Sequence, residues 1–243
     1  MKKSILILAA VLFGFNSSNA QFWKDESVKG NGKVTTENRN TGDYDEVKLT
    51  GFMDVELTAG TEGRLIIEGE SNLLEHVITE VENGSLKIYT EKGYSLKPSK
   101  GKGIKITVPF KDLNAVSLTG SGDIWNTSVI RAQDFETSLT GSGDINLHLE
   151  VKNLKGLITG SGDTLVKGKA ENFEISVTGS GDFKAFNLEA KDVKAKIMGS
   201  GDIELTALNS LEAKVMGSGD ITYDGKPKKE DLRAMGSGSI SSR

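Results

Sequence analysis

Hydrophobic and polar residues alternate in short runs along the second half of the chain, and the runs recur every 18 to 21 residues. Before the motif that begins at Gly179, for example, Phe173, Ile175 and Val177 occupy every second position. Period-two alternation of β-branched and aromatic residues is typical of a strand with one buried face. A second alternating run follows each motif, so each repeat predicts two strands joined at a glycine-rich corner.

The corner motif is Gly-Ser-Gly-Asp in six copies and Gly-Ser-Gly-Ser in a seventh. The copies begin at Gly120, Gly141, Gly160, Gly179, Gly199, Gly217 and Gly236. One unit cannot bury its apolar face alone, but units stacked about 4.8 Å apart form a continuous core. We therefore expect an all-β fold, a single-stranded parallel β-helix of about seven 19-residue coils. The preference of parallel crossovers favours a right-handed helix, and a β-propeller is the weaker alternative because a blade needs about 40 residues.

The chain before the repeats lacks the motif but remains rich in predicted strands. Apolar runs occur at residues 47–49, 55–57, 65–67, 77–78, 86–89 and 104–108. Asn83-Gly84 between two of these runs predicts a tight hairpin, and Leu49 to Val55 is similar to a degenerate copy of the repeat. A solenoid needs a cap over its first edge. We expect residues 21–110 to form a β-rich capping region and residues 111–243 to form the repeat solenoid.

Residues 1–20 are predicted to be a secretory signal peptide. Lys2 and Lys3 provide a positive start, the apolar stretch from Ile5 to Phe15 is too short to span a bilayer, and small residues lead up to Ala20. No later stretch is long and apolar enough to be a membrane helix, and no cysteine near the cut could carry a lipid. We therefore expect export to the periplasm or the cell exterior, with cleavage near Ala20.

Composition excludes several function classes. The chain has no cysteine and only two histidines, which excludes disulfide scaffolds, thiolate metal sites and cysteine nucleophiles and disfavours multi-histidine metal centres. Its net charge is -4 and becomes -6 once Lys2 and Lys3 are removed, so nucleic acid is not the expected partner. Glycine is abundant at 29 residues, and 14 of these lie in the seven motifs.

The recurring segment from Phe135 to Ile145 resembles the bacterial DUF2807 family, described as "putative auto-transporter adhesin, head GIN domain". Gly51 to Val55 and Ile106 to Pro109 are also similar to that family, so the resemblance covers roughly residues 40–240. It implies an exported β-solenoid, in a family frequent in the Bacteroidetes group. It brings no catalytic or ligand-binding residue to this chain.

Stacking places one aspartate of each motif in a column along the solenoid: Asp123, Asp144, Asp163, Asp182, Asp202 and Asp220. Like charges about 4.8 Å apart repel by about 0.9 kcal/mol in water, so something must offset the repulsion. We expect each carboxylate to accept hydrogen bonds from its own Gly-Ser-Gly corner. The alternative is that oxygen ligands of adjacent coils bind Ca²⁺, although the known calcium-binding repeat has a different period. We expect no other cofactor.

Two further columns of outward positions suggest a binding surface on the last three coils. Met198, Met216 and Met235 lie one residue before the motif, and Lys196, Lys214 and Arg233 lie two residues earlier. Exposed apolar columns often mark contacts, and methionine suits adaptable ones. This surface could bind an anionic glycan or a protein, or support self-association, unless the methionines pack under a loop. Trp125 on the first coil could stack on a sugar or pack against residues 28–110.

The sequence offers no catalytic residue. Acids two coils apart would have a spacing near that of an inverting glycosidase, but catalysis needs two carboxyl groups in different environments, and the six aspartates have near-identical ones. We therefore predict a non-enzymatic, exported β-solenoid with a binding or adhesion surface, whose partner is a protein or glycan at the cell surface. The alternatives are a purely structural envelope protein and a glycan-active enzyme.

Overall fold

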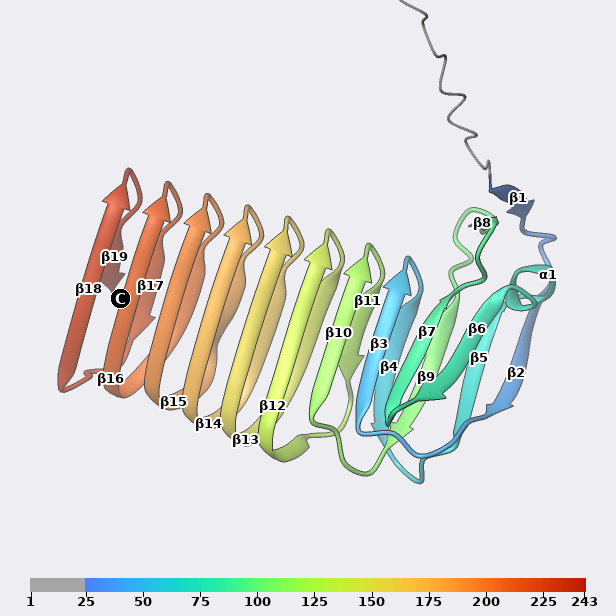
Figure 1. Ribbon diagram of the computed structural model, residues 1–243, viewed down its shortest axis with the longest axis horizontal. Helices are drawn as coiled ribbons and strands as arrows, with labels where there is room; N and C mark the ends of the chain where they lie inside the picture. The colour runs from blue at the N-terminus through green and yellow to red at the C-terminus, as the bar shows by residue number, and fades with distance from the viewer. Residues whose placement is uncertain (1–24) are drawn as a thin grey trace, which may run out of the picture.

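Two stacks of parallel strands run along the molecule, and each coil contributes one leg to each stack (Figure 1). The computed structural model describes residues 25–243, so the predicted signal peptide lies outside the described residues. We call the legs that end at the motif glycines the front stack and the legs that begin after the motif the return stack. The predicted all-β solenoid with coils about 19 residues apart is confirmed.

Most coils are joined by strands that run without a break from the return stack into the next front stack. These long strands are β13 (Asp144–Gly160), β14 (Thr164–Gly179), β15 (Phe183–Gly199) and β16 (Ile203–Gly217). Shorter strands complete the two stacks: β10 (Ala115–Gly120), β11 (Asp123–Asn126), β12 (Ile130–Gly141), β17 (Ile221–Asp224), β18 (Lys229–Gly236) and β19 (Ile240–Ser242). Pairing with the neighbouring coil continues on both sides of the bend, with register shifts in the return legs between β14 and β15 and between β15 and β16.

The first glycine of each motif is required by the backbone of the neighbouring coil. Gly160 pairs in register with Gly141 and has a φ of 129°, which L-amino acids rarely adopt. A Cβ atom on Gly160 would lie 2.3 Å from the carbonyl oxygen of Gly141. The high glycine content of the chain therefore follows from the close stacking of the corners.

The core lies between the two stacks and consists of the inward residues of the alternating pattern. Phe173 and Phe183 are fully buried, and their ring centroids lie 5.6 Å apart. Gly156 leaves the room that the Phe183 ring fills, because a Cβ there would lie 2.6 Å from that ring. Side-chain volumes are thus matched between neighbouring coils, as close packing requires.

The degenerate copy near Gly51 forms a further coil. Its legs are β3 (Glu46–Gly51) and β4 (Asp54–Ala59), which pair with β10 and β11. Gly51 lies in register with Gly120 and has a φ of 128°. The solenoid therefore begins before the first complete motif.

A group of strands that mixes parallel and antiparallel pairing closes the N-terminal end of both stacks, and we call this part the cap. It comprises β2 (Val34–Asn40), β5 (Arg64–Glu70), β6 (Val77–Glu82), β7 (Ser85–Thr90), β9 (Lys105–Phe110) and the short helix α1 (Ser71–Leu74). The strand β5 runs antiparallel to β2 and β9, and β6 runs antiparallel to β7. The predicted hairpin is present, with Asn83 and Gly84 both at positive φ. Beside the cap, β1 (Glu26–Lys29) pairs with β8 (Tyr94–Lys97).

A buried carboxylate holds the loops of the cap together. Glu70 is 1% exposed and accepts hydrogen bonds from the amide of Ser99 at 2.7 Å, the hydroxyl of Ser99 at 2.7 Å and the amide of Gly32 at 2.5 Å. The Ser99 amide contributes most to holding the pKa of Glu70 below its usual range, although burial opposes it. The cap is thus specified by individual contacts and not by a repeat.

No helix within residues 25–243 has the length and apolar character needed to cross a membrane.

Candidate ligand-binding groove

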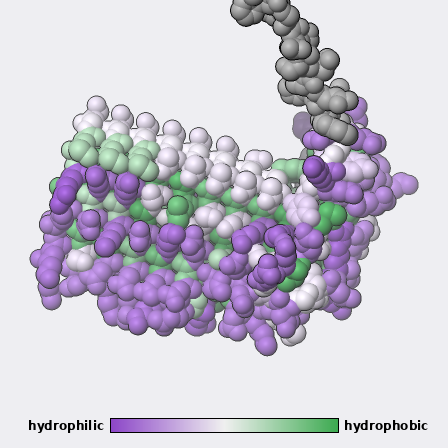
Figure 2. All heavy atoms as spheres, in the orientation of Figure 1, coloured by the Kyte–Doolittle hydropathy of each residue, from purple (hydrophilic) through white to green (hydrophobic). Residues whose placement is uncertain are grey.

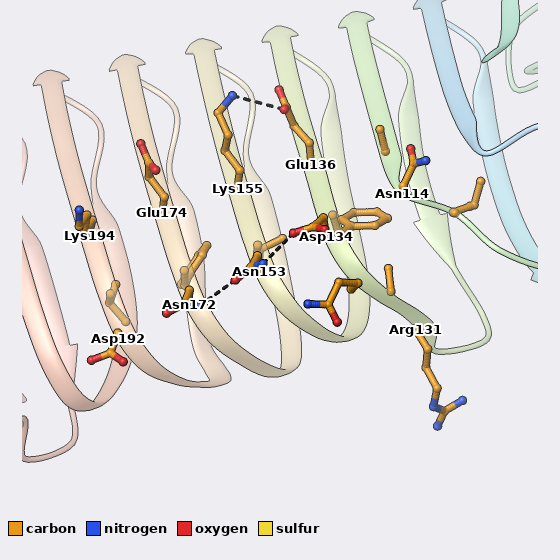
Figure 3. Close-up of a pocket in the computed structure, with 18 of the residues that line it drawn as sticks. Asn114, Arg131, Asp134, Glu136, Asn153, Lys155, Asn172, Glu174, Asp192 and Lys194 are labelled. Atoms are coloured by element: carbon orange, nitrogen blue, oxygen red, sulfur yellow. Dashed lines mark hydrogen bonds and ion pairs between the residues drawn. The ribbon is translucent and has the colours of Figure 1, made fainter. Parts of the chain in front are cut away.

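A groove of about 1430 Å³ runs along the front stack, beside the bend where each return leg becomes the next front leg (Figure 3). It extends from Asp45 near the first coil to Asp231 on the last coil, so it crosses the whole repeat region. Its walls repeat with the coils, because the residues that line it lie in register from strand to strand.

The first wall is a column of amide, carboxylate and hydroxyl side chains, which we call the amide column. Its members lie in register: Asp134, Asn153, Asn172, Asp192 and Ser210. The Asn153 amide donates to Asp134 at 2.7 Å, and the Asn172 amide donates to Asn153 at 2.7 Å (Figure 3). These bonds orient Asp134, Asn153 and Asn172 along the wall of the groove.

Asp192 breaks the amide series and remains ionised. Its Oδ1 accepts hydrogen bonds from the Ser210 hydroxyl at 2.5 Å and the Asn209 amide at 2.7 Å. These contacts, that of Ser210 first, lower the pKa of Asp192 below its ordinary value. Asp192 is therefore a hydrogen-bond acceptor and not a proton donor at neutral pH.

The second wall is a column whose charges alternate in sign along most of its length. The in-register residues are Glu136, Lys155, Glu174, Lys194, Glu212 and Asp231. Lys155 forms an ion pair with Glu136 at 3.3 Å (Figure 3). Alternation keeps like charges from facing each other across adjacent strands, which would be destabilising.

Charge over the whole groove is nevertheless negative. Ten acidic and five basic side chains line it. Its floor is made by the edges of inward residues such as Phe135, Phe173 and Leu211, which are 2 to 3% exposed. The groove therefore offers hydrogen bonding on its walls, little exposed aromatic surface, and an acidic excess that repels polyanions.

The aspartate column lies at the corners, away from the groove lining, and its carboxylates bond to the next coil and not to their own corner as expected. The carboxylate of Asp144 accepts the amide of Asp163 at 3.1 Å, and that of Asp163 accepts the amide of Asp182 at 3.0 Å. Asp123, Asp182, Asp202 and Asp220 make the same contact with the coil that follows each. The negative charges are thus offset by amides that stacking itself brings into place.

At one point of the aspartate column, a lysine also reduces the repulsion between the stacked carboxylates. Lys184 lies 2.6 Å from Asp163 and 3.6 Å from Asp182. Burial acts to raise the pKa of Asp163, but hydrogen bonds from Lys184 and from the Asp182 amide lower it overall. Among residues 25–243, no three His, Cys, Asp or Glu side chains are grouped so that they could hold a metal ion.

The methionine and basic columns lie in register on the last three coils. Met198 pairs with Met216 and Met216 with Met235, and Lys196, Lys214 and Arg233 follow the same ladder. Met198 is 36% exposed and Met235 is 53% exposed. Figure 2 shows an apolar patch near the corner edge of these coils. The structure thus brings together the six residues that the sequence grouped.

Trp125 lies apart from those columns. It is half-buried, its indole Nε1 lies 3.4 Å from Glu56, and the Lys105 ammonium lies 5.4 Å from the centroid of its ring. Glu56 is on β4 and Lys105 begins β9, so Trp125 packs against the N-terminal region. This is the second of the two placements that the sequence left open.

Sequence reasoning missed the groove itself. Its columns lie five and seven residues before the motif, where the side chains are polar and vary in type. The signal that could have revealed it was the pair Asn153 and Asn172 at equal offsets from their motifs. Aligned asparagines on a solenoid form hydrogen-bonded ladders, but the bend that hollows the surface beside them is not visible in the alternation pattern.

Comparison with known proteins agrees with the fold. The family model DUF2807, described as "Putative auto-transporter adhesin, head GIN domain", matches residues 43–227. A "putative adhesin" from Bacteroides fragilis NCTC 9343 has a crystal structure similar to this chain, with a TM-score of 0.81 and 25% identity. The match covers 89% of this chain and 100% of that one.

Two structures from Parabacteroides distasonis ATCC 8503 are also similar. One is a "putative lipid binding protein" with a TM-score of 0.74 and 30% identity, covering 90% of this chain and 100% of that one. The other is a "putative adhesin" with a TM-score of 0.70 and 26% identity, at the same two coverages. No curated protein matches the chain.

Proposed function

The chain belongs to the DUF2807 family, and from this premise we propose that it is an exported, non-enzymatic protein of the bacterial cell envelope that binds an extended, neutral glycan in the groove. The observation that carries the proposal is the groove's repetition from coil to coil along the front stack. A site that repeats along an axis is matched by a ligand that repeats along the same axis.

The spacing of the coils favours a glycan over a peptide. Adjacent strands of a sheet lie about 4.8 Å apart, which is close to the length of one pyranose unit in an extended glycan. An extended peptide advances about 3.3 Å per residue and would lose register with the columns after a few coils. Successive sugar units can instead meet equivalent side chains, such as Asn153 and Asn172, on successive coils.

The chemistry of the walls favours a neutral ligand. Sugar hydroxyls both donate and accept, and the groove offers amides, carboxylates and ammonium groups along its length. Its excess of five acidic side chains opposes an anionic polymer. An anionic partner would therefore bind outside the groove, at the basic column that contains Lys196 and Lys214.

A location at the envelope is supported by the N-terminal sequence and by the relatives. The positive, apolar and small-residue segments before Ala20 are typical of a cleaved export signal. Two similar structures, from Bacteroides fragilis and Parabacteroides distasonis, are each described as a "putative adhesin". Surface exposure would place the groove within reach of glycans of the envelope or of other cells.

Binding without turnover is favoured by the chemistry of Asp192, a carboxylate in the groove wall. Hydrolysis of a glycosidic bond needs one protonated and one ionised carboxyl group around a single scissile position. Asp192, whose pKa is lowered, is unsuited to supply that proton. The purely structural role remains the alternative for a protein whose groove binds nothing.

Calorimetry with neutral linear oligosaccharides tests the proposal. The double variant Asn153→Leu with Asn172→Leu removes two members of the amide column, and we expect it to lose at least tenfold in affinity because buried hydroxyls of the glycan lose partners. The matched control, Thr159→Leu with Thr178→Leu, changes the same two coils outside the groove lining and should bind normally. Equal binding by both variants would place the site elsewhere.

Chromatography of the same oligosaccharides after long incubation tests for catalysis. We expect no shorter product. Product formation would identify a glycan-active enzyme, and the absence of both binding and product across neutral glycans would favour the structural role.

A further inference from the structure

The C-terminal end of the solenoid presents an unpaired strand edge, unlike the capped N-terminal end. The last front leg, β18, pairs with β16 on one side, and β19 pairs with β17. Among residues 25–243, no strand pairs with the outer edge of β18. Open parallel edges of this kind invite pairing with another chain.

Exposure along β18 contrasts with its neighbour. All eight residues of β18 are exposed, including Leu232 at 37% and Ala234. Their partners in β16, Ala213 and Val215, are buried. The end of the hydrophobic core is therefore uncovered at this coil, and covering it would remove apolar surface from water.

The direction of the free backbone groups on β18 follows from the ladder. In the equivalent leg of an inner coil, the amide of Glu136 donates to Asn114 of the preceding coil, and Glu136 is equivalent to Asp231. Backbone groups alternate from side to side along a strand. Asp231 and Arg233 therefore direct their amides to β16, and Leu232 directs its N–H and C=O to the open edge.

We infer that two copies of this chain pair through β18 in an antiparallel arrangement about a two-fold axis at Leu232. In this register Leu232 faces Leu232 of the second copy as a hydrogen-bonded pair, which matches the direction of its free N–H and C=O. Asp231 then faces Arg233 of the second copy as a non-hydrogen-bonded pair, in which side chains approach most closely. Each dimer contains this opposite-charge contact twice.

Neighbouring registers are less favourable. An axis at Glu230 would place two glutamates opposite each other, and an axis at Asp231 or at Arg233 would pair like charges. An axis at Ala234 would face Arg233 with Met235 and lose the opposite-charge contact. Within one copy, Arg233 forms an ion pair with Asp231 of its own strand at 2.7 Å, and both side chains are exposed. On dimerisation each side chain can exchange this partner for the equivalent residue of the second copy. The sequence of β18 is thus self-complementary at Leu232.

The symmetry has two consequences. A two-fold interface uses β18 of both copies, so assembly stops at a dimer and does not extend to a filament. The axis of an antiparallel pair is perpendicular to the sheet, so both front stacks, with their grooves, face the same side. The dimer would therefore present both grooves to the same target surface. Two linked binding sites raise the avidity for such a surface without any new contact.

Analytical ultracentrifugation of charge-swapped variants tests the register. We expect reversible dimerisation of the unchanged protein and about a tenfold weaker dimer for Asp231→Arg or Arg233→Asp alone, because each creates like-charge pairs. The double variant, Asp231→Arg with Arg233→Asp, restores opposite pairs and should dimerise like the unchanged protein. A monomer at all concentrations, higher oligomers, or a dimer insensitive to the single swaps would each overturn the inference.

Oxidative cross-linking locates the axis directly, because the chain has no cysteine of its own. Facing Cα atoms of a hydrogen-bonded antiparallel pair lie about 5.5 Å apart, within the range of about 4.4 to 6.8 Å that disulfides span, so Leu232→Cys should form a covalent dimer on mild oxidation. Thr140→Cys, exposed on an inner coil, serves as the control and should remain monomeric under the same conditions. Cross-linking by Met216→Cys without cross-linking by Leu232→Cys would instead support self-association through the methionine column and contradict the axis at Leu232.

Discussion

The cap and the repeated coils reach the same buried β architecture by different means. In the coils, stability comes from in-register repetition: glycine on glycine at the corners, amide on carboxylate in the aspartate column, and apolar residues stacked between the legs. In the cap, single contacts replace columns, such as Glu70 bound by three groups and the Tyr44 hydroxyl donating to Pro109 at 2.5 Å.

This difference teaches where each region tolerates change. A repeated contact can be lost once and compensated by the coils on either side, unless the change blocks stacking itself. A unique contact in the cap has no copy, so its loss exposes the end of the core. Substitutions at matched positions separate the two cases.

The largest effect is expected at a corner glycine. Gly160→Ala would force a Cβ against the carbonyl oxygen of Gly141 and strain a φ of 129°, and should cost on the order of 3 kcal/mol in the free energy of unfolding. Gly42→Ala, at a site before the first coil with open space and no positive φ, should change it by less than about 0.5 kcal/mol. Urea denaturation of both variants measures the contrast, which equal stabilities would refute.

The next largest effect is a pH dependence of folding stability that arises from Glu70 in the cap. The pKa of Glu70 is lower in the folded protein than in the unfolded chain, so its contribution to stability is present at neutral pH and is lost as pH falls from the ordinary glutamate pKa through the folded value. Glu70→Gln should lower Tm at neutral pH and flatten this acid dependence. Glu68→Gln, on the exposed face of the same strand, should leave the profile unchanged. A profile for Glu70→Gln identical to that of the unchanged protein would show that the cap does not depend on this carboxylate.

Substitution within the aspartate column separates hydrogen bonding from metal binding. Asp182→Ala removes the acceptor of the Asp202 amide and should cost about 1 kcal/mol. Asp182→Asn keeps an acceptor oxygen and removes one of the stacked charges, so stability should change little. Thermal melts with added calcium or with a chelator should coincide, and a calcium-dependent rise in Tm that Asp182→Asn abolishes would instead support the metal alternative.

The smallest effect concerns a defect in the repeat. Thr137 is buried, its hydroxyl has no hydrogen-bond partner, and the residue in register on the preceding coil is Val116. Thr137→Val removes the unpaired polar group at nearly constant volume and should stabilise the protein by about 0.5 kcal/mol. A loss of stability in a urea titration would mean that the hydroxyl is bonded in solution.

Sequence reasoning predicted the solenoid because its determinants are local and repeated. Alternation before Gly179 defined a buried face, and constant motif spacing implied stacked corners, so even the degenerate coil at Gly51 was recognisable. The antiparallel direction of β5 and β2 was not predicted, since alternation is the same for strands of either direction. The partner of each aspartate was also missed, because the amide that it accepts lies a full coil away in sequence.

The candidate site was harder to predict for a related reason. The groove lies beside the bends within long strands such as β13 and β14. In the sequence, outward residues such as Glu136 and Lys155 do not distinguish a groove wall from a solvated face. The methionine column was visible because it changes abruptly from Thr178 to Met198. The sequence therefore indicated the methionine column by its composition, whereas the groove is recognised only from the shape of the folded chain.

The most direct test of the binding proposal is the dependence of affinity on glycan length, measured by calorimetry with a series of neutral linear oligosaccharides. If the ligand follows the columns, each added sugar reaches another coil, so affinity should rise with length until the groove is filled and then level off. An affinity already maximal for a single sugar would show that one local pocket binds the ligand and would contradict the account.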